Sequence, residues 1–143
     1  MAMQDFQRKF RLNDLTIHNY QYWVLSLRPQ QLTLGSMVLS LKRPCTSLAD
    51  LTADESQELG SIFHDVEQCQ TALFAFDKIN YLALMMVDNQ VHMHILPRYQ
   101  QSRDFAGIRF IDEHWPGPVT DFSKGCSDDG VLYQILNAIK TEL

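Results

Sequence analysis

The pattern of apolar and polar residues predicts two strand regions in the first third of the chain. Residues 15–27 are rich in branched and aromatic side chains, typical of one bent strand or two short ones, and Pro29 ends the ladder. Gly35 then opens a second region, over residues 35–42. Its alternation predicts a strand with one fully buried face, formed by Met37, Leu39 and Leu41 against Ser36, Val38 and Ser40.

Helical periodicity follows in two places. Thr52 and Glu55 have the spacing of a capping box, which predicts a helix that begins there and runs to about Phe76. Its apolar stripe consists of Leu59, Ile62, Phe63, Val66, Cys69, Leu73 and Phe74. A C-terminal helix is predicted over residues 131–139, after an acidic start. Residues 100–125 contain glycines and prolines and are predicted to be mostly loop.

The stretch from Asn80 to Arg98 predicts an antiparallel hairpin. "NYLALMMV" and "QVHMHILPR" are both typical of strands, and Asp88 and Asn89 between them suit a two-residue turn. Period two in the second strand separates an apolar face from a polar one. Val91, Met93 and Ile95 share the first face, and Gln90, His92 and His94 share the second. We therefore expect one face in the core and a site on the other.

The polar face has three interpretations. It could be a solvated sheet edge, although the strict alternation beside a wholly apolar face argues for a position inside the sheet. His92 and His94 could ligate a metal, but the third ligand would have to come from His64, His114 or a remote carboxylate. Alternatively, one neutral imidazole attacks phosphorus while the other orients the phosphate or carries a proton.

Composition limits the class of protein. The 143 residues, 45% of them hydrophobic, suffice for a single domain spanning residues 1–143 with its own core. The net charge of −5, with dispersed basic residues, argues against nucleic acid as a partner. No apolar run is long enough to predict a membrane span or a signal peptide. Three cysteines without paired spacing favour a reducing, cytoplasmic location for a soluble, unprocessed chain.

The segment "QVHMHILPR" resembles the signature of the histidine triad (HIT) superfamily, His-h-His-h-His-h-h, where h is hydrophobic, here followed by Pro-Arg. The stretch "LRPQQLTLGSMVLSLKRPCTSLADLTADESQEL" is similar to the part of these proteins that leads from a ribose-contacting strand into the long helix. The resemblance covers roughly Phe10 to Tyr99.

This resemblance implies an α+β fold with a five-stranded antiparallel sheet, one long helix and a C-terminal helix, in a homodimer. It also implies hydrolysis or transfer of nucleoside monophosphates, from nucleoside phosphoramidates or dinucleoside polyphosphates, through a nucleotidyl-histidine intermediate. By position, His92 matches the nucleophile and His94 the third histidine of the motif, which helps hold and protonate the α-phosphate. A nucleotide or nucleotide-derived small molecule is then the expected partner, with no cofactor and no metal.

Four positions depart from the family pattern or add to it. Gln90 stands where the first histidine would be, and an amide cannot exchange a proton near neutral pH. Arg28 falls near the place where the family often uses an acidic or amide residue on the ribose. Asn89 lies in a turn that is longer in many members, and Arg98 could lend charge to a phosphate. The expected site therefore comprises Gln90, His92 and His94 as catalytic residues, with Arg28, Asn89 and Arg98 on the substrate. A metal-binding sheet and a catalytically silent nucleotide binder remain alternatives.

Overall fold

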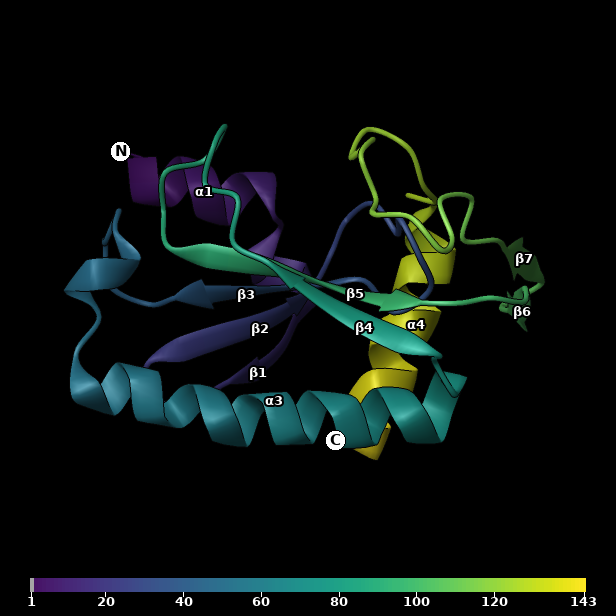
Figure 1. The fold of residues 1–143 in the computed structure, drawn as a ribbon, viewed down its shortest axis with the longest axis horizontal. Helices are drawn as coiled ribbons and strands as arrows, with labels where there is room; N and C mark the ends of the chain where they lie inside the picture. Colours follow the sequence, from purple (N-terminus) through teal and green to yellow (C-terminus); the bar gives the residue numbers. More distant parts are fainter. Residues whose placement is uncertain (1) are drawn as a thin grey trace.

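The computed structural model describes residues 2–143 as an α+β fold built on a five-stranded antiparallel sheet (Figure 1). The spatial order of the strands is β1-β2-β3-β5-β4, so β5 lies inside the sheet and β4 at its edge. The predicted strand region 15–27 forms two strands. The strands are β1 (Thr16–Asn19), β2 (Trp23–Leu27), β3 (Met37–Leu41), β4 (Lys78–Leu82) and β5 (His92–Arg98).

Both predicted helices are present. The long helix α3 (Ala53–Phe74) begins at the predicted capping box, in which the Thr52 hydroxyl accepts from the Glu55 N–H and the Glu55 carboxylate accepts from the Thr52 N–H. It ends at Ala75, whose φ of 48° stops the helix just before Phe76. The C-terminal helix α4 covers Asp129–Glu142, and the shorter helices are α1 (Ala2–Lys9), α2 (Leu12–Leu15) and the 3₁₀ turn η1 (Leu48–Asp50).

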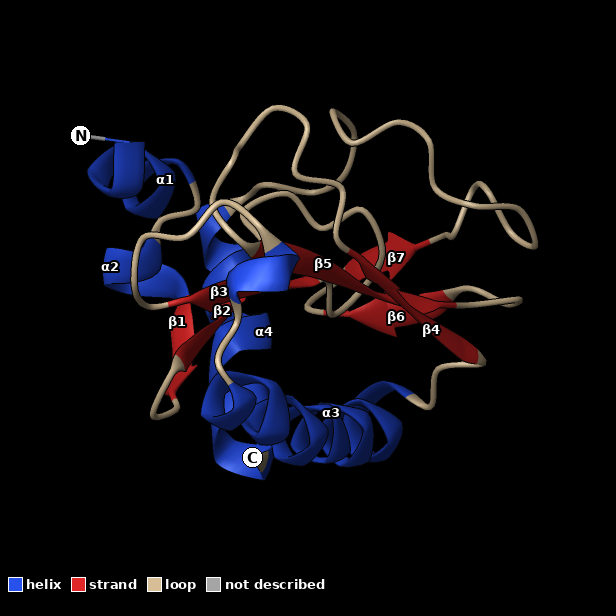
Figure 2. Ribbon diagram, turned by 60° about the vertical axis from the view of Figure 1, so that its left-hand side comes forward, coloured by secondary structure: helices blue, strands red, loops and turns tan. Residues whose placement is uncertain are grey.

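Helices cover both faces of the sheet. In Figure 1 and again in Figure 2, α3 lies on one side of the sheet and α1 on the other. The main core fills the α3 side and includes Met37, Leu39, Leu41, Met93, Ile95, Ile62, Val66 and Leu132. On the other side Val38 packs with Phe6 and Phe10. β3 is therefore buried on both faces, because the N-terminal segment covers Val38 in addition to the face that was predicted to be buried.

The strands β4 and β5 pair antiparallel, as predicted, but the expected two-residue turn at Asp88 and Asn89 is wrong. Residues 83–91 form a long connection instead. Met86 and Val87, counted as strand residues for their apolar character, are 83% and 85% exposed. Asp88 is bound by Lys9 of α1, with 2.7 Å between Nζ and Oδ2. This tertiary contact positions the connection, which the local pattern could not indicate.

The segment 100–125 is mostly loop, as expected, but it includes a small hairpin of β6 (Arg103–Phe105) and β7 (Ile108–Phe110). Its two-residue turn consists of Ala106 and Gly107, both with positive φ, as a hairpin of this length requires. Alanine is a rare choice there, so the turn carried no recognisable signal. No helix within residues 2–143 has the length and apolar character to cross a membrane.

Candidate active site

His92 and His94 lie side by side on the face of β5 that is opposite the main core. Their ring centroids are 5.1 Å apart, and the two residues are only 2% and 7% exposed. Both line a cavity of about 580 Å³, a volume typical of small-molecule sites. The rest of its lining comes from four separate segments and comprises Lys9, Phe10, Arg28, Pro29, Gln30, Leu84, Met85, Met86, Val87, Asp88, Phe122 and Ser123.

The surroundings of His92 fix its protonation. Its Nδ1 lies 2.5 Å from the main-chain carbonyl oxygen of Gln90, which can only accept a hydrogen bond, so Nδ1 carries the hydrogen. The rings of Phe6 and Phe10 pack against the imidazole, at centroid distances of 5.1 Å and 5.8 Å. Burial lowers the pKa of His92 and keeps the ring neutral. Nε2 therefore holds a free electron pair.

His94 has the opposite tautomer. The Arg28 Nε donates to His94 Nδ1 over 3.4 Å, so in the neutral ring Nε2 carries the hydrogen. Burial first, and then the charge of Arg28, lowers the pKa of His94 to about 3. The cavity thus contains two neutral imidazoles of complementary character, one with a nucleophilic nitrogen and one with an N–H donor.

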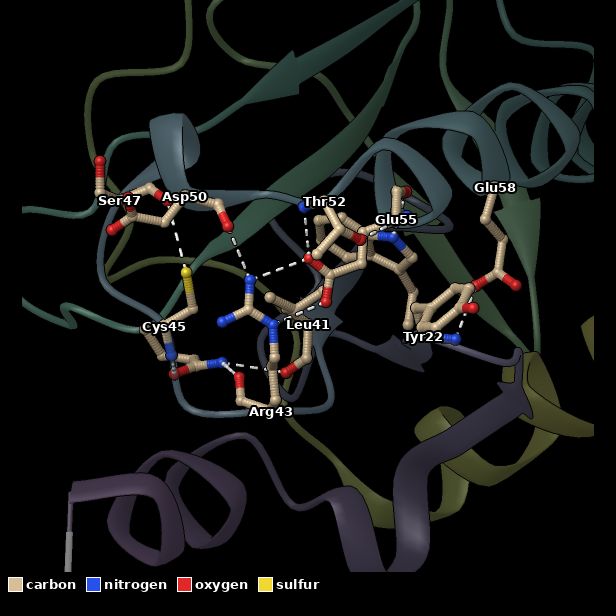
Figure 3. Close-up of polar contacts among 11 residues, drawn as sticks. Tyr22, Leu41, Arg43, Cys45, Ser47, Asp50, Thr52, Glu55 and Glu58 are labelled. Atoms are coloured by element: carbon tan, nitrogen blue, oxygen red, sulfur yellow. Dashed lines mark hydrogen bonds and ion pairs between the residues drawn. The ribbon is translucent and has the colours of Figure 1, made fainter.

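The structure does not bring the side chain of Gln90 into the histidine cavity. It reaches the chain after β3, where Nε2 donates to the carbonyls of Leu41 (2.9 Å) and Arg43 (2.8 Å) and Oε1 accepts from the Cys45 N–H (3.1 Å). This chain is in turn fixed to α3 by Arg43, whose guanidinium binds the Glu55 carboxylate (Figure 3). Gln90 therefore contributes to the site through its main-chain carbonyl, which an isolated side-chain pattern cannot reveal.

The predicted substrate-binding residues separate into two groups. Arg28 lines the histidine cavity. Asn89 instead lines a neighbouring cavity of about 850 Å³, which it shares with Gln90 and Arg43. Arg98 is outside both linings and forms a buried ion pair with Asp112, 2.7 Å between Nε and Oδ2. It also donates to the Asn80 side chain and the Gly117 carbonyl, so its charge is used within the fold.

Several lining residues were missed by sequence reasoning. Lys9 reaches the cavity from α1, and Phe122 reaches it from the loop before α4. The spacing of Phe6 and Phe10, four residues apart, is a helical signal that could have identified the face of α1 that packs on the sheet. Phe10 also lines the cavity, whereas Trp23 of β2 lies fully buried in the core.

The metal interpretation lacks a third ligand in this structure. Across residues 2–143, no group of three or more histidine, cysteine or acidic side chains is placed to hold a metal ion. His64 lies on the exposed side of α3, and His114 lies in the loop after β7, so neither joins His92 and His94 in lining the cavity.

Comparison with known proteins identifies the fold. No protein-family model matches the sequence, and no curated protein does. Solved structures do match: a histidine triad protein of Sinorhizobium meliloti has a TM-score of 0.74 at 21% identity, with 93% of each chain covered. One from Bradyrhizobium japonicum has a TM-score of 0.72 at 20% identity, covering 92% of this chain and 93% of that one. A histidine triad nucleotide-binding protein of Sulfolobus tokodaii has a TM-score of 0.66 at 13% identity, and the match covers 90% of this chain and 82% of that one. The chain has the histidine triad (HIT) fold, as its motif predicted.

Proposed function

We propose that this protein is a nucleotide hydrolase or nucleotidyl transferase that acts through a covalent intermediate on His92. The observation that carries the proposal is the pair of buried, neutral imidazoles with complementary tautomers, at the wall of a cavity of nucleotide size. Solved HIT-fold neighbours include one described as nucleotide-binding, which supports a nucleotide as the ligand.

In the proposed reaction, Nε2 of His92 attacks the α-phosphorus of a nucleoside phosphoramidate or dinucleoside polyphosphate. A nitrogen–phosphorus bond forms, and the bond to the leaving group breaks. As positive charge develops on the imidazole, its Nδ1–H strengthens the hydrogen bond to the Gln90 carbonyl. The N–H of His94 donates to a phosphoryl oxygen or to the leaving group. Water, or another acceptor in a transferase, then takes the nucleotidyl group and frees His92.

The rest of the cavity suits a nucleoside. Phe10 and Phe122 offer aromatic faces on which a base can stack, and Met85 and Met86 supply flexible apolar contacts. Lys9 stands at the rim with its charge partly balanced by Asp88. This lining favours binding through the base and the phosphates together.

The proposal is tested by trapping the intermediate. Purified protein is incubated with adenosine and guanosine phosphoramidates and dinucleoside polyphosphates, quenched in base, and analysed by peptide mass spectrometry. We expect a nucleotidyl adduct on His92, and we expect His92→Ala to lose several powers of ten in turnover while the exposed His64→Ala keeps it. Binding without adduct or turnover would identify a silent nucleotide binder, and stoichiometric zinc without turnover would favour the metal alternative.

We also propose that the protein is a homodimer and that it works in the cytoplasm. The strand β4 leaves one edge of the sheet open, and Phe63 of α3 packs on Tyr81 of β4 at 4.6 Å, with both residues only partly buried. A second copy could cover this edge and the aromatic pair.

The proposed cytoplasmic location is supported by Cys45, Cys69 and Cys126, which are all free thiols.

A further inference from the structure

Arg28 is a buried cation without a carboxylate partner. The residue is 7% exposed, and within residues 2–143 no acidic side chain forms an ion pair with it. Arg98, which is equally buried, shows the usual solution, because Asp112 neutralises it. An unpaired buried charge is costly, so the position of Arg28 requires an explanation other than stability.

The contacts of Arg28 leave part of its guanidinium unused. Nε donates to His94, one terminal nitrogen donates to the Gln30 carbonyl (2.9 Å), and the other donates weakly to the Phe122 carbonyl (3.4 Å). A guanidinium has five N–H donors, so about two remain. The group is also held against the Phe122 ring, 5.6 Å from its centroid. Arg28 is therefore fixed in place, charged, and able to bind an anion in the cavity that it lines.

This guanidinium lies on the His94 side of the cavity. Arg28 contacts His94 directly, whereas the ring neighbours of His92 are Phe6, Phe10 and His94, and no contact in the described chain joins Arg28 to His92. An anion bound by Arg28 would accordingly lie apart from the phosphorus that His92 attacks.

We propose that Arg28 binds a second anionic group of the ligand, so that the preferred substrates are nucleotides that carry at least one phosphate besides the reacting one. The inference rests on the proposed function, since it defines the second group relative to the phosphoryl group attacked by His92. The additional phosphate can be on the ribose or further along the 5′ chain, and the same guanidinium chemistry recognises both.

The test is equilibrium binding, which needs no turnover. Isothermal titration calorimetry compares adenosine 5′-monophosphate with adenosine 5′-diphosphate and the 2′,5′- and 3′,5′-bisphosphates, and repeats the series with guanosine. At least one probe with two phosphates should bind about tenfold or more tightly than the monophosphate. Preference for the diphosphate would place the second phosphate in the 5′ chain, and preference for a bisphosphate would place it on the ribose.

Three variants make the test specific. Arg28→Gln should weaken binding of the two-phosphate probes about tenfold or more beyond any loss for the monophosphate, and Arg28→Lys should keep part of the preference because the charge remains. Arg109→Gln is the matched control, because that arginine is exposed and its ion pair with Asp104 lies at the surface. Thermal unfolding checks that each variant is folded. If Arg28→Gln does not fold, the comparison uses Arg28→Lys alone, which should show a reduced preference for the two-phosphate probes.

Four results would overturn the inference: equal affinities for all probes, no measurable binding of any probe, a preference that survives Arg28→Gln, or an equal loss for the monophosphate and the two-phosphate probes. The last would mean that Arg28 binds the reacting phosphate itself. Equal affinities together with a His92 adduct would reject this inference alone, whereas a clear preference without any adduct would reject the enzymatic proposal alone.

Discussion

At the scale of single residues, the two histidines of β5 differ because different groups touch them. A main-chain carbonyl holds the hydrogen of His92 on Nδ1, and a guanidinium holds the hydrogen of His94 on Nε2. Neither ring has a carboxylate as hydrogen-bond partner among the described residues, so burial dominates the pKa of both. In the proposed reaction, the paired imidazoles could therefore act as nucleophile and donor without any change of protonation beforehand.

The first prediction concerns Gln90, whose side chain secures the chain after β3. Gln90→Ala removes three hydrogen bonds, two of them buried and one partly buried, and should lower the free energy of unfolding by about 2–4 kcal/mol. It should also lower kcat, because the carbonyl that orients His92 is no longer fixed. Urea denaturation and steady-state kinetics measure the two effects. Gln57→Ala, at an exposed position of α3, is the control and should change neither; an unchanged stability of Gln90→Ala would contradict this role.

The second prediction concerns the pH dependence of stability. The pKa of His94 is about 3 in the folded protein, against about 6.5 in an unfolded chain, so below pH 6.5 the unfolded state binds a proton that the folded state does not. Stability is therefore complete above about pH 6.5 and falls as the pH decreases towards 3. Between pH 7 and pH 5, His94→Asn should reduce this fall by about 1–2 kcal/mol in urea denaturation. His64→Asn should leave the fall unchanged, and an equally steep fall in both variants would exclude His94 as its source.

At the scale of elements, α1 packs over His92 and contributes to the wall of the histidine cavity. Its Phe6, together with Phe10 in the turn that follows, packs on His92, and its Lys9 binds Asp88 in the connection between β4 and β5. This short helix thereby contacts both His92 and the exposed apolar connection, residues 83–91, which forms another wall of the cavity. The desolvation that keeps His92 neutral depends on this packing.

The third prediction tests that cover. Phe6→Ala should admit water to His92, so that the pKa of His92 rises towards its ordinary value, as measured by carbon-13 NMR titration of the histidine ring. The lost packing should also cost about 3 kcal/mol of stability. Phe105→Ala removes the same ring from the small hairpin, where it packs on Phe74, and should leave the His92 titration unchanged. A His92 pKa that does not rise in Phe6→Ala would show that α1 contributes nothing to it.

Elements with strong local signals were predicted from the sequence, and elements that depend on distant partners were not. The capping box and apolar stripe identified α3, and alternation identified β3 and β5. Phe6 of α1 and Phe10 just after it pack on a strand face that the sequence alone leaves unassigned. Residues 83–91 form a connection, although their apolar residues, which are exposed in the structure, gave them the pattern of a strand. Period two likewise placed His92 and His94 together. It could not show that Arg98 is neutralised by Asp112, or that the Gln90 side chain turns towards Leu41 and Arg43.

At the scale of the whole molecule, the sheet has the main hydrophobic core on one face and the histidine cavity on the other. The main core lies between one face of the sheet and the helices α3 and α4, so the opposite face can carry buried polar groups such as Ser40, His92 and His94. These groups are held by β5, which lies between two other strands and is therefore among the best-fixed parts of the fold. The proposed chemistry on His92 would thus take place on a rigid central strand, which holds both imidazoles in fixed positions.

The last prediction concerns assembly. The monomer already buries Ile62, Val66, Cys69 and Phe74 of the α3 stripe, so we expect the proposed dimer to use the edge at β4 and the partly buried aromatic pair of Phe63 and Tyr81 beside it. Unpaired strand edges bind other strands readily, and β4 has neither a proline nor a bulge to prevent it. Light scattering at low micromolar concentration should give twice the chain mass of 16.6 kDa. Phe63→Glu should shift the protein to the monomer by placing a charge in the interface, whereas Gln57→Glu on the same helix should remain dimeric. A wild-type protein that is only a 16.6 kDa species would contradict the dimer and would leave the edge of β4 open to solvent.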